Sequence, residues 1–246
     1  MNTEGTAHDT SLLISHLGSY LPSALPPPTQ HLVLGISLGG HTSWHCIAFD
    51  PRITAAIVII GCPDFTRLMC QRASKTRLKS WNATKPAGSS FLGSPDFPRT
   101  LLGEMERSDP AGHLLPSYLK ADPKRGYDWE TGSDEGRNLN KVLPTDYARL
   151  SSKLDATLKG KAILNLSGGA DKLVPYGCGR VFFDYLKGAV GPGGWWTNNG
   201  VVFDDRRFDG IGHNVSPAMA DAAVEFIGKV LSGEIGGKAN AKASRI

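Results

Sequence analysis

The segment that most constrains the fold is the one where a strand pattern passes into a helix pattern through a short glycine-rich turn. His31–Ile36 is a compact apolar run of strand length, and Ser37-Leu38-Gly39-Gly40 follows it at once. Residues 38–49 contain no helix breaker after this turn and end at Asp50-Pro51, which is typical of a helix. Ile53–Ile60 is a second apolar, β-branched run, typical of a strand buried on both faces of a parallel sheet. The order strand, helix, strand predicts an α/β unit.

The same alternation returns in the last third of the chain. Strand patterns over residues 161–166 and 200–203 alternate with helical patterns over residues 177–186 and 218–231. Alternating strands and helices predict an α/β fold, with a mostly parallel sheet and flanking helices.

The long middle of the chain and its two ends differ from these segments in composition. The first nine residues are predicted to be unstructured, and a short amphipathic helix capped by Asp9 or Thr10 is expected over Ser11–Leu21. The middle is rich in Pro, Gly, Ser and charged residues, so it is expected to form a lid over the sheet. The predicted organisation is a core of residues 9–61 and 156–232, a lid or cap insertion of residues 62–155, and a flexible tail of residues 233–246.

The overall composition is that of a globular protein. The chain has 246 residues, 40% of them apolar and 20% charged, and 27 Lys and Arg against 23 Asp and Glu leave a net charge of +4. The longest apolar stretch, Ala55–Ile60, is far too short to cross a bilayer. Basic residues are not interleaved with aromatic ones as they are in proteins that bind single-stranded nucleic acid. A membrane span and a nucleic-acid partner are therefore not expected.

The cysteines and the chain ends bear on the cellular compartment. The four cysteines are scattered without a CxxC pair, and no signal-peptide pattern opens the chain. A reducing cytoplasmic environment is the expectation. The alternative is the peroxisome, because Ser244-Arg245-Ile246 resembles a variant of the Ser-Lys-Leu address at the C-terminus.

The turn after the first strand also carries the strongest chemical signal. Gly35-Ile36-Ser37-Leu38-Gly39 fits the G-x-S-x-G pattern of a nucleophile elbow, with the required strand before it and helix after it. The glycines, with Gly40, are expected because a serine on a strained tight turn needs small neighbours where strand and helix approach. The turn would hold the Ser37 hydroxyl at the positive end of the helix, where the N–H of Leu38 can face a developing oxyanion.

A serine nucleophile needs a base, and the base needs an acid that orients it. Of the seven histidines, His213 is favoured because Gly210–Asn214 is a glycine-rich loop between the last strand pattern and the final helix. Asp171 is favoured as the acid because it follows the strand pattern of residues 161–166. Three carboxylates nearer to this histidine in sequence are competitors: Asp204, Asp205 and Asp209. The order Ser37, Asp171, His213 matches the order of serine, acid and histidine expected after a nucleophile elbow.

Three segments together carry a family resemblance: Gly35–Gly40, Asp171–Pro175 and Gly210–Asn214. They resemble the α/β-hydrolase superfamily, most closely its small esterase and prolyl-oligopeptidase-like branch and fungal hydrolases of that type. The resemblance implies that Ser37 attacks an acyl carbonyl, His213 takes and returns the proton, and Asp171 holds the histidine tautomer. It implies a serine hydrolase that cleaves an ester, thioester or lactone of a small-molecule acyl substrate through an acyl-enzyme, without a cofactor.

The start of the chain departs from the pattern of that family. The family normally carries further strands before the nucleophile, and one of their turns supplies a second oxyanion N–H, often from an HGGG-type loop. Nothing in residues 1–34 resembles that loop. The expected sheet is therefore shortened on its N-terminal side and activity is expected to be impaired. The strand His31–Ile36 then lies open at the sheet edge, which is prone to association. Three explanations stay open: the chain is a shortened form, a second copy covers this strand as a homodimer, or the lid supplies the second oxyanion donor.

Two alternative functions remain open from the sequence. A hydrolase-like binding or interaction protein would keep the same three residues without turnover. An acyltransferase would form the same acyl-enzyme but pass the acyl group to an acceptor other than water.

One metal-like spacing occurs in the helix that follows the serine. His41 and His45 stand four residues apart, as metal-binding histidines on a helix do. No HExxH glutamate or third ligand accompanies them, so helix packing is the interpretation and no metal is expected.

Overall fold

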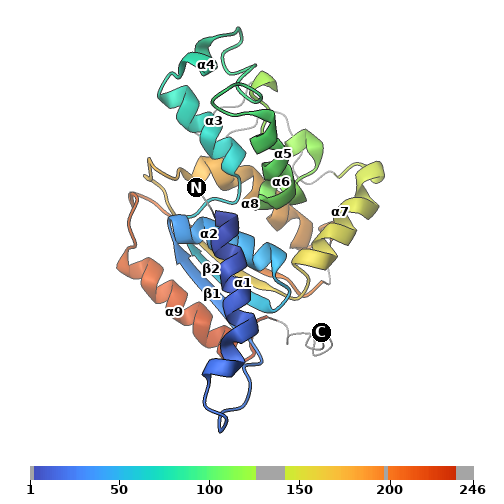
Figure 1. Ribbon diagram of the computed structural model, residues 1–246, viewed down its shortest axis with the longest axis vertical. Helices are drawn as coiled ribbons and strands as arrows, with labels where there is room; N and C mark the ends of the chain where they lie inside the picture. The colour runs from blue at the N-terminus through green and yellow to red at the C-terminus, as the bar shows by residue number, and fades with distance from the viewer. Residues whose placement is uncertain (1–2, 126–141, 197–198, 237–246) are drawn as a thin grey trace.

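The structure, a computed structural model, describes residues 3–125, 142–196 and 199–236 of the chain (Figure 1). Its described strands form one four-stranded sheet in the order β1-β2-β3-β4. The strands are β1 (His31–Ile36), β2 (Ile53–Ile59), β3 (Ala162–Gly168) and β4 (Val202–Phe208). Every neighbouring pair is parallel. The predicted α/β fold with a parallel sheet is confirmed.

The two central strands are buried along their whole length, and the two edge strands are partly exposed. Every residue of β2 and β3 is buried, as expected for apolar strands covered by helices on both faces. Along one row of the register, Leu34 of β1 lies beside Ile57 and Ile57 beside Leu164. The row ends at Asp204 of β4. This row is thus apolar across β1, β2 and β3 and becomes polar at β4.

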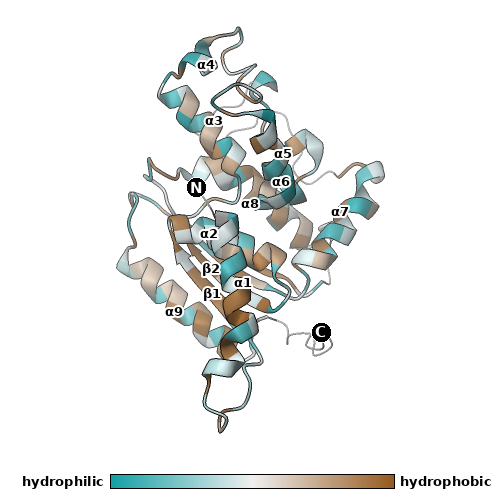
Figure 2. Ribbon diagram, viewed as in Figure 1, coloured by the Kyte–Doolittle hydropathy of each residue, from teal (hydrophilic) through white to brown (hydrophobic). Residues whose placement is uncertain are grey.

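Helices cover both faces of the sheet. On one face lie α2 (Leu38–Phe49) and α8 (Tyr176–Val190), and α1 (Thr3–Tyr20) packs against α2 (Figure 1). On the other face lies α9 (Pro217–Leu231), whose apolar side packs against β2 and β3. Trp44 of α2 belongs to the core of the first face. In Figure 2 the strands are mostly brown, while the helices carry teal on much of their surface.

A run of short helices follows β2 in the chain; in Figure 1 α3 and α4 lie above the sheet, while α7 lies at its side. The helices are α3 (Phe65–Lys75), α4 (Lys79–Asn82), α5 (Arg99–Ser108), α6 (Pro110–Leu114), the 3₁₀ turns η1 (Ser117–Leu119) and η2 (Pro123–Arg125), and α7 (Pro144–Thr157). Trp81 and Phe91 belong to an apolar cluster of this region. Leu68 of α3 clusters with Val174 from the loop after β3. The division into core and lid stays a prediction, and α7 continues across its boundary at residue 155.

The first helix starts earlier than its sequence pattern predicts. Residues 3–9 belong to α1, so the predicted unstructured start is wrong for them, and the proposed cap residues lie inside the helix. The physical reason is contact with distant parts of the chain: Ala7 of this segment packs against the core that contains Trp44 of α2, and the rest of the helix is also tied down. Arg52 donates from Nη2 to the carbonyl of Ser11 (2.8 Å) and from Nη1 to Oγ of Ser15 (2.7 Å). These bonds fix the helix against the turn before β2.

Strand β4 is longer than its apolar pattern predicts. The pattern ends at Phe203, but the strand pairs with β3 up to Phe208. The added residues are mostly charged, and they are accommodated because β4 is an edge strand of the described sheet. Asp204, for example, accepts hydrogen bonds from Nε and Nη2 of Arg206 within the strand.

The C-terminal predictions fall mostly on residues beyond the last helix. The structure describes the predicted tail only as far as residue 236. The peroxisome-like Ser244-Arg245-Ile246 lies outside the described residues. Among the helices that the structure describes, none has the length and apolar character needed to cross a membrane.

Candidate active site

Ser37 occupies a strained turn between β1 and α2. Its φ is +55°, a conformation that non-glycine residues rarely adopt. Its N–H donates to the carbonyl of Ile59 (2.9 Å). Backbone strain of this kind collects at functional sites and persists only where the surroundings enforce it. The turn therefore presents the serine at the carboxyl edge of the sheet.

The surrounding glycines explain how strand and helix come so close. A Cβ at Gly35 would lie 1.9 Å from the carbonyl oxygen of Gly39, and one at Gly40 would lie 3.0 Å from Cα of Gly61. A Cβ at Gly39 would meet nothing within 4 Å. The crowding predicted from the sequence therefore applies to Gly35 and Gly40, while at Gly39 it does not.

His213 comes from the loop between β4 and α9 and meets the serine directly. Its Nε2 lies 2.8 Å from Oγ of Ser37. The loop is held against the turn after β3, because the N–H of Ala170 donates to the carbonyl of Ile211 (2.8 Å). A Cβ at Gly168 would lie 2.5 Å from the carbonyl oxygen of Gly212. Two loops that follow neighbouring parallel strands are thereby locked together at one edge of the sheet.

Asp171 completes the arrangement from the loop after β3. Its Oδ2 lies 2.8 Å from Nδ1 of His213, and its Oδ1 accepts from the N–H groups of Leu173 (2.8 Å) and Val174 (2.9 Å). The carboxylate side chain is 0% exposed and the histidine side chain 22% exposed. Since a carboxylate only accepts, Nδ1 donates to it, and Nε2 of the neutral imidazole then accepts from the serine hydroxyl.

The competing carboxylates have other partners. Asp205 is buried in β4, where Tyr176 Oη–H (2.9 Å) and Nζ of Lys187 (2.6 Å) donate to its Oδ2. Asp204 pairs with an arginine of its own strand, and the exposed Asp209 pairs with Arg207. Of the four carboxylates considered from the sequence, Asp171 is therefore the one that contacts the histidine.

The N-terminus of α2 supplies a donor beside the serine. Leu38 is the first residue of the helix, so its N–H belongs to the first turn and has no acceptor within the helix. The first helical N–H that finds a partner is that of His41, which donates to the carbonyl of Ser37 (3.1 Å). No described residue accepts a hydrogen bond from the N–H of Leu38. The group expected to face an oxyanion is thus uncommitted among the described residues.

One supporting contact was missed by the sequence reading. Arg72 of α3 donates from Nη2 to the carbonyl of Leu173 (3.1 Å), two residues beyond Asp171. It ties the helix after β2 to the loop that holds the acid. The partners are 101 residues apart in the chain, and neither belongs to a motif, so no sequence signal could have paired them.

His41 and His45 are both buried on α2. Nδ1 of His41 contacts the main chain of Cys62, 2.8 Å from its carbonyl oxygen and 3.0 Å from its nitrogen. No group of three or more His, Cys, Asp or Glu with metal-binding geometry occurs within the described parts of the chain. The two histidines contact main chain and neighbouring rings, in keeping with the packing role inferred from their spacing.

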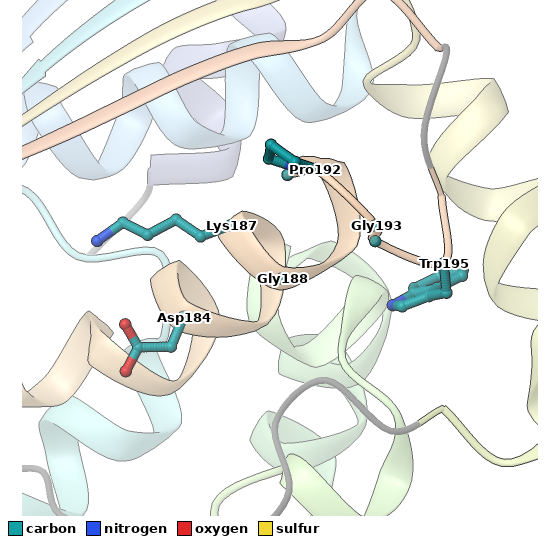
Figure 3. A pocket seen from close by; sticks show the side chains of 8 residues that line it. Asp184, Lys187, Gly188, Pro192, Gly193 and Trp195 are labelled. Carbon is teal, nitrogen blue, oxygen red and sulfur yellow. The ribbon is translucent and has the colours of Figure 1, made fainter.

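The hollow shown in Figure 3 lies away from these residues. Its volume is about 550 Å³, and it surrounds the end of α8 and the glycine-rich loop up to Trp195. The charged side chains at its rim are already paired, Asp184 with Arg180 and Lys187 with Asp205. Ser37, Asp171 and His213 do not line it.

The parallel sheet, the strained serine turn between strand and helix, and the acid and histidine loops after the next strands have the arrangement of an α/β-hydrolase fold. The resemblance stated from the sequence therefore holds at the level of the fold. No protein-family model matches the chain, and no curated protein matches it in sequence.

Solved structures similar to the chain include three at low identity. SOBER1 from Arabidopsis thaliana is 12% identical, with a TM-score of 0.45 over 93% of this chain and 64% of that one. Esterase PE8 is 11% identical, with a TM-score of 0.45 over 93% of this chain and 61% of that one. ATU1826 from Agrobacterium tumefaciens, a protein of unknown function proposed as an alpha/beta hydrolase, is 14% identical, with a TM-score of 0.42 over 94% and 62%. The chain thus spans less than two thirds of each.

Proposed function

We propose that the chain is a serine hydrolase that cleaves an ester, thioester or lactone through an acyl-enzyme on Ser37. The observation that carries the proposal is an unbroken series of two contacts, from Oγ of Ser37 to Nε2 of His213 and from Nδ1 of His213 to Oδ2 of Asp171, both 2.8 Å. A serine hydroxyl is activated when a base lies within hydrogen-bond distance of it and an acid orients that base.

The acylation half of the reaction follows from the hydrogen-bond directions. Oγ of Ser37 attacks the acyl carbonyl while its proton passes to Nε2 of His213. The carbonyl oxygen becomes an anion, and the N–H of Leu38 donates to it at the positive end of α2. When the carbonyl reforms, the bond to the alcohol or thiol breaks, and the imidazolium returns the proton to that leaving group. Asp171 keeps Nδ1 protonated throughout.

Deacylation uses the same groups in reverse. A water molecule gives a proton to Nε2 of His213 and attacks the acyl carbonyl. The second tetrahedral intermediate breaks its bond to Oγ of Ser37, and the imidazolium protonates the leaving serine oxygen. The products are a carboxylic acid and the regenerated hydroxyl.

The test is labelling with a fluorophosphonate probe, which reacts with activated serines. The wild-type protein should be labelled on Ser37, and Ser37→Ala should abolish labelling. Ser43→Ala is the matched control, since it removes a buried hydroxyl from the same helix. Folded wild-type protein that stays unlabelled would refute the proposal. Labelling without turnover of short p-nitrophenyl esters would favour the hydrolase-like binding protein, and transfer products formed with added alcohols or amines would favour the acyltransferase.

The homodimer predicted from the sequence is part of the proposal. In the described sheet β1 is an edge strand, and its Leu34 and Ile36 are 46% and 47% exposed. An apolar edge with unpaired main-chain groups favours pairing with the same strand of a second copy. Light scattering should give the mass of a dimer for the wild type and of a monomer for Leu34→Lys. A monomeric wild type at micromolar concentration would contradict it.

A further inference from the structure

Each residue of the proposed triad has an exposed aliphatic side chain within two positions of it in the sequence. The three side chains are Leu38, Leu173 and Val215, and their exposed fractions are 49%, 59% and 38%. A single exposed aliphatic residue is ordinary on a protein surface. An apolar patch around a reactive group is different, because such patches mark binding sites. We call these three residues the apolar collar.

The main chain of Leu173 is held beside the acid and the base. Its N–H donates to Oδ1 of Asp171 (2.8 Å), and Oδ2 of the same carboxylate lies 2.8 Å from Nδ1 of His213. Its carbonyl accepts from Nη2 of Arg72 (3.1 Å). The exposed Leu173 side chain therefore starts from main chain that is fixed on both sides next to the triad.

The position of Val215 is fixed in a similar way. The N–H of Asn214 donates to the carbonyl of Gly212 (2.9 Å), which closes a tight turn around His213. Ser216 then caps α9, and its hydroxyl accepts a hydrogen bond from the first turn of that helix. Val215 lies between the turn and the cap, so it stays close to the histidine.

The chemistry of acylation brings the substrate to the same place. Leu38 is bonded directly to Ser37 and starts α2. In the proposed tetrahedral intermediate the carbonyl oxygen faces the N–H of Leu38, and the leaving oxygen faces Nε2 of His213. The hydrocarbon of the acyl group begins at the carbon that carries these two oxygens. It therefore begins beside the apolar collar.

The charged side chains beside the collar do not favour an ionised acyl group. Arg72 is bonded to the carbonyl of Leu173, and Lys172 is exposed. A cationic acyl group would be repelled by both. An anionic one would pair with Lys172 in contact with solvent, where such pairs contribute little, and would lose hydration against the aliphatic side chains. These surroundings favour an uncharged chain.

We propose that Leu38, Leu173 and Val215 determine the substrate specificity of the enzyme and select esters with an uncharged aliphatic acyl chain over acetate. The inference rests on the proposed function, since the ester is held at Ser37. A fully buried methylene contributes about fourfold to kcat/KM, and one covered from a single side contributes about twofold. Because the collar residues are partly exposed, the preference should rise gradually with chain length and have no sharp optimum.

The first test measures labelling rates with fluorophosphonates that carry a methyl, butyl or hexyl chain. The hexyl probe should label Ser37 about 30-fold faster than the methyl probe, at about twofold for each of five added methylenes. Leu173→Ser and Val215→Ser should each lower this ratio by about threefold. The matched controls are Leu231→Ser and Val224→Ser, which remove exposed side chains from the later turns of α9. They should keep the wild-type ratio.

The outcomes separate the collar from the hydrolase. If no probe labels the folded wild type, the proposed function fails. If all three probes label Ser37 at the same rate, the serine is active and the apolar collar alone is overturned. A ratio that falls as far in the two controls as in the two collar variants would also overturn it.

The second test compares p-nitrophenyl esters of equal length with and without a charge. The kcat/KM for p-nitrophenyl butyrate should exceed that for the p-nitrophenyl monoester of succinate, and Leu173→Ser should narrow the difference. Lys172→Ala should leave the order of the two esters unchanged. A preference for the succinate ester that is lost in Lys172→Ala would show that this cation selects the substrate, and it would overturn the apolar collar.

Discussion

Two polar clusters lie at opposite edges of the same sheet and are built for different tasks. At the carboxyl edge, Ser37, Asp171 and His213 come from three loops, and the histidine remains 22% exposed. At the amino edge, just before β2 and β3, Asp50 and Lys161 are buried. In the first cluster, Oγ of Ser37 and Nε2 of His213 can face a substrate. The second commits its donors to main-chain carbonyls, so it can only stabilise.

The amino-edge cluster is closed by its hydrogen bonds. Nζ of Lys161 donates to the carbonyls of Ile47 (2.6 Å) and Asp50 (2.9 Å). The carboxylate of Asp50 accepts from Nε and Nη2 of Arg52 (3.0 and 2.6 Å). The remaining guanidinium donor reaches Ser15 of α1. Burial and charge alone therefore do not identify a site; the carboxyl edge differs because its serine hydroxyl is paired with a histidine that remains partly exposed.

The largest effect is expected for Asp171→Asn at the carboxyl edge. The amide can hold His213 in the wrong tautomer, and the same change in a well-studied triad lowers kcat about 10⁴-fold. The measurement is kcat on p-nitrophenyl butyrate, with the urea midpoint as a check on folding. Asp205→Asn is the matched control, because it changes a buried carboxylate of β4 that does not contact the histidine. It should lower stability and keep most of kcat; a loss equal to that of Asp171→Asn would contradict the assignment.

The amino edge should respond in the opposite way. Lys161→Met removes the donor from two buried carbonyls, and the unsatisfied groups should cost about 2–4 kcal/mol of unfolding free energy. Turnover per folded molecule should not change, because the residue lies across the sheet from Ser37. Urea unfolding and active-site titration on the same sample measure both quantities. A loss of turnover with unchanged stability would show that Lys161 acts in catalysis and not in folding.

A smaller loss of stability is expected for Arg52→Ala. The guanidinium is 33% exposed, so solvent weakens its ion pair, but the carboxylate that loses its partner is buried, and the change should cost about 1–2 kcal/mol. The effect should concentrate in α1, which loses the bonds to Ser11 and Ser15. Hydrogen exchange should speed up in that helix before it does in β2 or β3. Uniform destabilisation of all elements would argue against a local role.

The two edges also differ in how much of them the sequence could predict. The turn at Ser37 was predictable because the residues that define it are close in sequence. Gly35 and Gly40 lie within three residues of the serine and permit the close approach of strand and helix. Asp171 and His213 followed from the rule that loops after parallel strands meet at one edge. The early start of α1 was not predictable, because Ala7 packs against core residues that are distant in the chain. The charged end of β4 escaped for a similar reason, since its ladder with β3 overrides its polar composition.

The dependence of the unfolding free energy on pH above 8 tests the Lys161 amine. Burial lowers the pKa of this amine to about 8, against 10.5 for the unfolded chain. Between these values the unfolded state binds more protons than the folded state, so the unfolding free energy should rise with pH. Urea unfolding at pH 8, 9 and 10 should show that rise in the wild type and a flatter curve in Lys161→Met. Parallel curves would show that this amine does not titrate in the window.

The stability of the protein below pH 4 tests Asp50. Burial acts to raise the pKa of this carboxyl, but hydrogen bonds from Arg52 and Ser11 outweigh it and lower the pKa to about 2, against 3.8 unfolded. The stabilisation is therefore present above pH 3.8 and is lost as the pH falls towards 2. Asp50→Asn should flatten the urea midpoint in that window, while Asp209→Asn, an exposed pair at the other edge, should follow the wild type. Equal acid sensitivity in all three proteins would show that the titrating carboxylate lies elsewhere and that Asp50 does not stabilise the amino edge.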